Sequence, residues 1–133
     1  MPERLHLIAA EADDVPVLSA LLQDAAVRAI DIGYDAAQRR FALLASRYRW
    51  EAKSRTRVRA ALSIEGVTRV RRKGWPVAPD AVLDLLTIQV EDDELALDFA
   101  GGASLRLQVE AIDMLLDDIA GPWAAKREPS HDD

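Results

Sequence analysis

Short segments of this chain alternate between apolar and polar side chains, and this alternation limits the folds that the chain can adopt. In residues 57–64, every second residue from Val58 to Ile64 is apolar. Residues 95–99 and 105–109 repeat the pattern on either side of Gly101-Gly102. A period of two is typical of a β-strand with one face against a core. We therefore expect a sheet whose strands are joined by tight turns.

The same patterns place strands and helices along the whole chain. Strands are predicted over residues 5–10, 27–34, 41–50, 57–64, 67–71, 82–90, 95–99 and 105–109, and residues 82–86 could also open as a helix. Asp13 and Asp14 are suitable N-caps for a first helix over residues 14–25. A second helix over residues 111–120 would place Ile112, Leu115, Leu116 and Ile119 on one face and Asp113, Asp117 and Asp118 on the other, before Gly121-Pro122 ends it.

This element order predicts an α+β fold. We expect a curled, mostly antiparallel sheet or partly open barrel of about seven to eight strands, because short connections favour antiparallel neighbours. One short helix follows the first strand near the N-terminus, and a C-terminal helix caps the sheet. The order resembles the pleckstrin-homology-like superfold, which hosts many functions. Residues 1–125 are expected to form one domain, followed by a flexible polar tail over residues 126–133.

Composition excludes several classes of protein. With 133 residues, of which 50% are hydrophobic and 30% charged, the chain is of ordinary globular composition. It has no apolar run approaching the about 20 residues of a membrane helix. No secretory signal is visible at the N-terminus, so we expect a cytoplasmic protein that does not enter a membrane. Without cysteine there is no disulfide, thiolate metal site or cysteine nucleophile.

No group of residues has the spacing of a catalytic or cofactor site. His6 and His131 are far apart, and the acidic residues 91–94 are better explained as a solvated turn than as a cation site. Gly101-Gly102 lies between two strands, whereas a phosphate loop joins a strand to a helix. We therefore expect no cofactor and no enzymatic activity. An enzyme with an unrecognised carboxylate site, or a small-ligand binder at the mouth of the barrel, stays an alternative.

Charge is distributed very unevenly. The net charge is −6, but between Arg39 and Lys73 twelve basic residues face only Glu51 and Glu65, a net charge of +10. The remaining residues include 5 basic and 21 acidic ones, a net charge of −16. Such a field attracts anions over about 8 Å at physiological salt. One interpretation is that the acidic remainder folds back and neutralises the basic block.

A basic sheet face is the candidate binding site. If residues 41–50 and 57–65 form a hairpin, Arg47 and Arg49 can lie across from Arg57 and Arg59. Like charges across a sheet are destabilising and need a counter-anion. The candidate anion- or partner-binding residues are Arg47, Arg49, Arg57, Arg59, Arg69, Arg71, Trp50 and Trp75. By alternation, Tyr48 and Trp50 point away from Arg47 and Arg49, which favours a core position for both aromatics.

Two kinds of partner fit such a face. We favour an acidic protein partner or self-association, since arginine pairs with carboxylates. The alternative is a nucleic acid, with phosphates on the arginines and bases stacked on Trp50 or Trp75. The isoelectric point of 4.9 counts against a dedicated nucleic-acid binder, because such domains are usually basic.

Three segments carry a family resemblance: residues 18–25, 38–50 and 95–112. Together with Gly121-Pro122-Trp123, they resemble a small bacterial family catalogued as a domain of unknown function (domain of unknown function 2948). The likeness extends from Leu5 to Trp123. It implies a stand-alone bacterial protein and supplies no activity, cofactor or functional residues.

Overall fold

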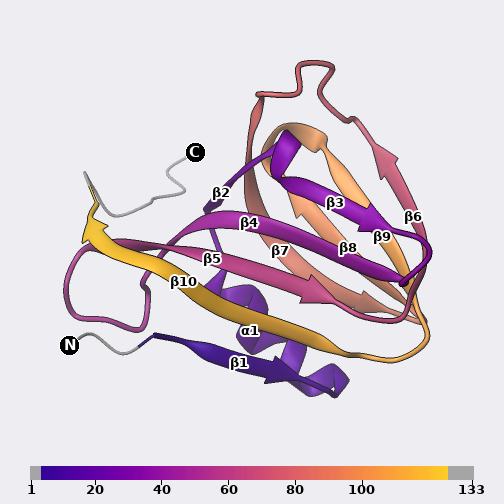
Figure 1. Cartoon of the computed structure of the whole chain (residues 1–133), viewed down its shortest axis with the longest axis horizontal. Coiled ribbons are helices and arrows are strands. Elements are labelled where there is room, and N and C mark those ends of the chain that lie inside the picture. The colour runs from indigo at the N-terminus through magenta and orange to yellow at the C-terminus, as the bar shows by residue number, and fades with distance from the viewer. Residues whose placement is uncertain (1–3, 126–133) are drawn as a thin grey trace.

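A single ten-stranded sheet dominates the computed structural model, which describes residues 4–125 (Figure 1). The strands are β1 (His6–Ala9), β2 (Ala25–Arg28), β3 (Ile32–Asp35), β4 (Arg40–Tyr48), β5 (Thr56–Ile64), β6 (Val67–Lys73), β7 (Val82–Glu91), β8 (Glu94–Phe99), β9 (Ser104–Val109) and β10 (Met114–Ala124). The helix α1 spans Val15–Leu21, and short 3-10 turns cover Ala12–Asp14, Ala29–Asp31 and Ala100–Gly102. The mostly antiparallel α+β fold is thereby confirmed.

The strand order explains the shape of the sheet. It is β1-β10-β5-β4-β2-β7-β8-β9-β6, with β3 attached to β4 beside β2. The sheet curls, so that β6, at its end, comes back towards β3 (Figure 1). The hydroxyl of Tyr34 on β3 donates a hydrogen bond to the carbonyl of Val67 on β6, at 2.7 Å. No β3–β6 ladder is formed within residues 4–125, so the sheet remains open there.

The helix α1 is the predicted N-terminal helix in a shorter form. Pro16 occupies its first turn, where the missing N–H costs no helical hydrogen bond. Val15, Leu18 and Leu22 are buried, and α1 packs mainly against β7. The chain turns out of the helix through Asp24, whose φ of 63° is left-handed.

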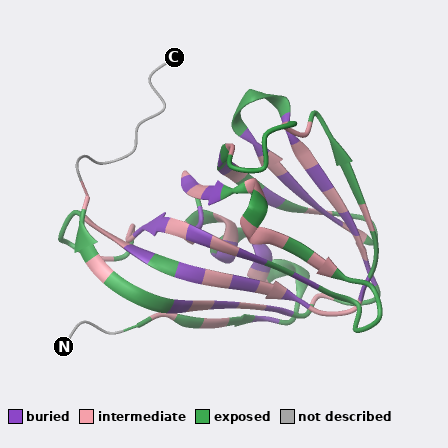
Figure 2. Cartoon of the chain, turned by 45° about the horizontal axis from the view of Figure 1, so that its top comes forward, coloured by how far each residue is buried: buried purple, intermediate pink, exposed green. Residues whose placement is uncertain are grey.

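The core lies between the curled halves of the sheet and α1. Figure 2 shows buried residues alternating with intermediate or exposed ones along several strands, as the period of two predicts. On β4, Phe41, Leu43 and Ala45 are buried, and on β9, Leu105 and Leu107 are buried. Further buried side chains are Leu18, Leu22, Leu62, Ile64, Leu85, Ile88, Leu95 and Leu97.

The predicted C-terminal helix is wrong. Residues 114–124 form β10, which pairs with β1 on one side and β5 on the other. Met114, Leu116 and Asp118 are buried, whereas the intervening Leu115 and Asp117 are less so. Two neighbouring strands satisfy the backbone of β10, and this tertiary pairing overrides a pattern that also fitted a helix. The C-terminal helix on which the comparison with the pleckstrin-homology-like superfold depended is therefore absent from residues 4–125.

The strand count also differs from the expected seven to eight. The run over residues 27–34 is interrupted by the 3-10 turn Ala29–Asp31 and becomes β2 and β3. With β10 as a strand, the total reaches ten. Residues 82–91 are strand throughout, which settles the ambiguous start of that segment. The tail over residues 126–133 lies outside the described part of the chain.

Candidate functional site

The six arginines predicted to share one basic face lie in different places. Register puts Arg47 opposite Val58, Tyr48 opposite Arg57 and Ser46 opposite Arg59. Cross-strand partners lie on the same side of a sheet, so Arg57 and Arg59 point outwards while Arg47 points into the core. Arg69 and Arg71 lie on β6, at the far end of the strand order from β5. The prediction that Arg47 and Arg49 lie across from Arg57 and Arg59 is wrong.

Arg47 is fully buried and its guanidinium is saturated with acceptors. Its Nε and Nη2 donate to the two carboxylate oxygens of Asp118, both at 2.8 Å. Its Nη1 and Nη2 donate to Glu51, at 2.9 and 2.7 Å, and Nη1 also contacts the carbonyl of Tyr48 at 3.4 Å. Ala60 lies opposite Asp118 on the intervening strand β5, and its small side chain leaves room for Arg47 to reach β10.

The electrostatics of this cluster hold the arginine charged. Burial lowers the pKa of Arg47, but hydrogen bonds to Glu51 and Asp118 outweigh that effect and raise the pKa above its ordinary value. The hydrogen bond from Arg47 is the main reason that the pKa of Glu51 lies below its ordinary value. Since all its donors are engaged inside the protein, Arg47 serves the fold and offers nothing to a partner at the surface.

The side chains around Arg47 are also engaged within the chain. Arg49 Nη1 donates to Thr56 Oγ1 at 3.2 Å, and Arg57 Nη1 donates to the carbonyl of Ser46 at 3.0 Å. The Trp50 ring packs edge-on against Tyr48, with 4.8 Å between centroids. Its indole Nε1 also donates to the carbonyl of Gln23 at 3.0 Å. These contacts leave Trp50 poorly placed for stacking on a base.

The strand β6 carries cations on both of its sides. Arg69, Arg71 and Lys73 lie opposite Gln108, Arg106 and Ser104, on the outer side of the sheet. Arg71 forms an ion pair with Glu94 on β8.

Val70 and Arg72 lie opposite the buried Leu107 and Leu105, on the core side. Within residues 4–125, the side chains of Arg69, Arg72 and Lys73 make no ion pair. These three residues of the predicted basic region thus lie on one strand and have no carboxylate partner in that part of the chain.

Trp75 lies at the opening between β3 and β6. Its ring contacts the ring of Phe99 edge-on, with 5.8 Å between centroids. A cavity of about 310 Å³ opens here, between Tyr34 and Ile32 on one side and Val70 on the other, and Trp75 lines it. A neighbouring cavity of about 400 Å³ shares Arg72 and Trp75.

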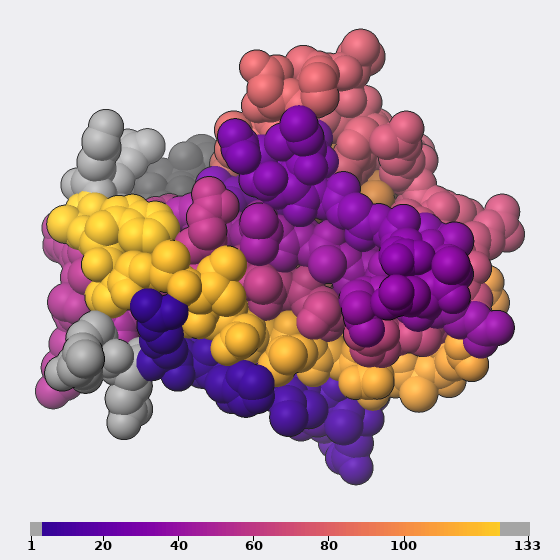
Figure 3. Space-filling model, in the orientation of Figure 1, coloured from indigo at the N-terminus to yellow at the C-terminus, as the bar shows by residue number. Residues whose placement is uncertain are grey.

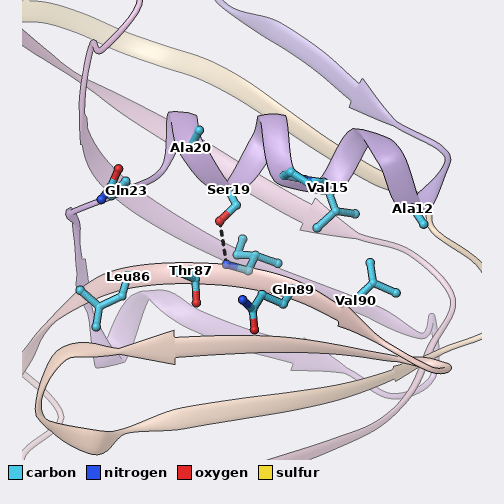
Figure 4. Close-up of a pocket in the computed structure, with 11 residues that line it drawn as sticks. Ala12, Val15, Ser19, Ala20, Gln23, Leu86, Thr87, Gln89 and Val90 are labelled. Atoms are coloured by element: carbon cyan, nitrogen blue, oxygen red, sulfur yellow. Dashed lines mark hydrogen bonds between the residues drawn. The ribbon is translucent and has the colours of Figure 1, made fainter.

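A second hollow lies between α1 and β7. Figure 4 shows the hydroxyl of Ser19 facing β7, where it accepts a hydrogen bond from the backbone N–H of Ile88 at 2.9 Å. The hollow has a volume of about 680 Å³, and its walls include Val15 and Pro16 on α1 and Leu86 and Val90 on β7. Its lining contains no charged residue, so it offers no site for the acidic partner expected from the sequence.

The carboxylates do not assemble into a metal site in the described residues. No group of three or more His, Asp or Glu side chains there is placed to hold an ion. His6 lies at the surface with its Nδ1 3.2 Å from Asp117 Oδ1, while His131 is outside the described range. In the acidic turn over residues 91–94, Asp93 accepts a hydrogen bond from Gln108 at 3.1 Å and Glu94 pairs with Arg71.

Fold and site together define a small sheet protein in which many charged side chains form ion pairs within the chain itself. The chain belongs to the family described as "Protein of unknown function (DUF2948)", whose model matches residues 5–131. This confirms the resemblance seen in the sequence. No curated protein and no solved structure matches the chain. None of the helices between residues 4 and 125 is long and apolar enough to cross a membrane.

Proposed function

We propose that this protein is a non-enzymatic interaction module and that an acidic segment of a protein partner binds along β6. The proposal rests mainly on the position of β6 at one end of the sheet, with free cations along it. One edge of an end strand has backbone N–H and C=O groups without a neighbouring strand, and an extended peptide can pair with them. In the described residues, the hydrogen bonds that Tyr34 and Arg39 make to β6 involve Val67 alone, at the start of this edge.

Charge complementarity specifies an acidic partner. The outward-facing Arg69 and Lys73 have no carboxylate partner within residues 4–125. An acidic segment paired with β6 would bring carboxylates beside both cations. Arg71 is already shared with Glu94 and contributes less. The arginine fork suits a carboxylate particularly well.

The same charges argue against two other partners. In self-association through antiparallel β6 strands, cations would face cations, which is destabilising. A single-stranded nucleic acid needs an exposed aromatic surface beside the cations. Trp50 is engaged with Tyr48 and Gln23, and Trp75 packs against Phe99. We therefore favour a carboxylate-bearing protein segment over phosphate.

A binding titration tests the proposal. A labelled peptide of alternating Glu and Val is titrated with the protein, in parallel with labelled single-stranded RNA and DNA, at ~50 and ~200 mM salt. We expect the acidic peptide to raise the fluorescence anisotropy at micromolar protein. Arg69→Glu with Lys73→Glu is expected to weaken peptide binding at least roughly tenfold, since two charge-assisted contacts are lost.

A matched variant separates a specific site from general charge. Lys53→Glu with Arg55→Glu makes the same change in net charge at the exposed loop between β4 and β5, and should leave peptide binding nearly unchanged. An equal loss in both variants would contradict the proposal, as would the absence of peptide binding at the lower salt concentration. Tighter binding of the oligonucleotides, with a log–log salt slope of about 0.7 per phosphate contact, would replace it with the nucleic-acid function.

A further inference from the structure

The opening between β3 and β6 has the features of a small-molecule site. Its walls combine Ile32 and Tyr34 on β3 with Val70 on β6, and Phe41, Trp75 and Leu105 add apolar side chains to a lining that also has polar surface. The cavity of about 310 Å³ is at the lower end of the range for small-molecule sites, roughly 300–1,000 Å³. We propose that this opening binds a small molecule with an apolar body and one anionic group, which Arg72 recognises.

Arg72 is the charged group of this opening. It lies opposite the buried Leu105, on the side of β6 that faces the core, whereas Arg69 and Lys73 face outwards. Arg72 and Trp75 line both this cavity and the neighbouring one of about 400 Å³. In the described part of the chain, the Arg72 guanidinium has no carboxylate partner and no hydrogen bond.

The other lining residues supply no negative charge to pair with Arg72. Neither cavity has an Asp or Glu side chain among its lining residues. The Tyr34 hydroxyl already donates its proton to the carbonyl of Val67, so its oxygen can only accept a further hydrogen bond. Arg72 is exposed, so its guanidinium at the mouth of the cavity is free to pair with an anion that enters there.

The lining also determines the body of the ligand. Trp75 is held edge-on against Phe99, and Phe41 lies deeper in the same cavity. Aromatic walls favour a flat ring or a branched hydrocarbon. The guanidinium fork accepts either a carboxylate or a phosphate in two parallel hydrogen bonds. The ligand class is thus an aromatic or branched anion. An experiment decides whether its acidic group is a carboxylate or a phosphate.

Three probes with one ring system test the site. Naphthalene-2-carboxylate, naphthyl phosphate and naphthalene-2-methanol are each titrated into the protein by calorimetry, while amide and indole NMR shifts are followed. We expect an anion to bind at least roughly tenfold more tightly than the neutral alcohol, the gain of a charge-assisted hydrogen bond. The Trp75 indole signal, identified by its loss in Trp75→Phe, should shift with either anion. The tighter of the two anions identifies the acidic group.

Two substitutions on one strand provide the control. Arg72→Gln should abolish the difference between anion and alcohol, whereas Arg69→Gln, on the other side of β6, should preserve it. Both residues are exposed, so neither change threatens the core. Equal affinity for anion and alcohol in the unmodified protein would overturn the inference. Failure of all three probes to bind, or an equal effect of both substitutions, would overturn it as well.

This site does not depend on the acidic-segment proposal. The proposed strand pairing uses Arg69, Lys73 and the free edge of β6, which borders the opening, while the small molecule is recognised by Arg72. Loss of peptide binding in the Arg69 and Lys73 variant, with ligand binding intact, would separate the two sites.

Discussion

Arg47 shows how a strongly charged side chain becomes part of a sheet core. Its guanidinium lies between Asp118 and Glu51, and the pair of Arg47 with Asp118 is almost fully shielded from solvent. Removing charges from water is costly, and the cost is offset only where geometry satisfies every donor. Leu5 ties the N-terminal segment to the same cluster, because its backbone N–H donates to Asp118 at 3.1 Å.

Removing Asp118 should expose the cost of the buried charge. Asp118→Ala leaves Arg47 with Glu51 as its one carboxylate partner in the described residues, and we expect the free energy of unfolding to fall by about 3 kcal/mol. Urea unfolding followed by tryptophan fluorescence measures this change. The paired variant Arg47→Met with Asp118→Leu removes both charges and should be less destabilised than the single variant. A single variant within about 0.5 kcal/mol of the unmodified protein would mean that the pair adds no stability.

Glu51 gives the stability a pH dependence of known sign. Its pKa in the folded protein lies below its ordinary value of 4.5, so near that pH the unfolded chain binds more protons than the folded one. The stabilisation from Glu51 is therefore complete above pH 4.5 and is lost as the pH falls through the lowered pKa. The stability advantage over Glu51→Gln should shrink from pH 7 to about pH 3 in urea titrations. A constant difference across this range would contradict the pairing with Arg47.

The sequence contains a signal for the buried pair of Arg47 and Asp118, although alternation alone does not predict the pairing. Arg47 has the same parity as Phe41, Leu43 and Ala45, and Asp118 has the parity of Met114 and Leu116. One charge at the end of each apolar row suggests two charges facing each other in the core. Alternation alone cannot pair them, because they are 71 residues apart and the strand order decides which rows meet.

At the scale of elements, β10 is the strand whose conformation the local sequence pattern does not predict. Ile112, Leu115, Leu116 and Ile119 fit a helical face as well as they fit a strand. Leu115 is half-buried on the outer side of β10 although Leu116 faces the core, so both sides of this strand carry apolar residues. Strands with a clean alternation, such as β5 and β9, were predicted closely. Pairing with β1 and β5 decides the conformation of β10, and that information is not local.

The connection after β6 depends on a glycine. Gly74 has a φ of +64°, and a Cβ there would lie 2.8 Å from the carbonyl oxygen of Gly102. Gly101 has a φ of +84° with no atom near its own Cβ position. Gly101→Ala should therefore cost only the left-handed conformation, about 1–2 kcal/mol, and Gly74→Ala clearly more. Thermal unfolding of both variants measures the difference, and equal losses would show that the approach of Gly74 to Gly102 is relaxed at no cost.

Across the whole molecule, the fold brings acidic residues of the remaining sequence next to the basic block. The block from Arg39 to Lys73 is partly neutralised by carboxylates from elsewhere: Glu110 pairs with Arg39, Asp118 with Arg47 and Glu94 with Arg71. Figure 3 shows that segments distant in the sequence meet across one face of the molecule. Part of the predicted neutralisation within the chain is therefore present. The cations left without carboxylates on β6 are the ones that the proposed function uses.

Amide hydrogen exchange along β6 tests the proposed function most directly. The acidic peptide is added to the protein, and exchange of the backbone amides of residues 69–73 is followed by NMR or mass spectrometry. If the peptide adds as a strand to the end of the sheet, the amides in this range that point away from β9 should become protected, with little change at β5. Binding of the peptide with unchanged exchange along β6 would contradict the account and place the acidic partner elsewhere on the molecule.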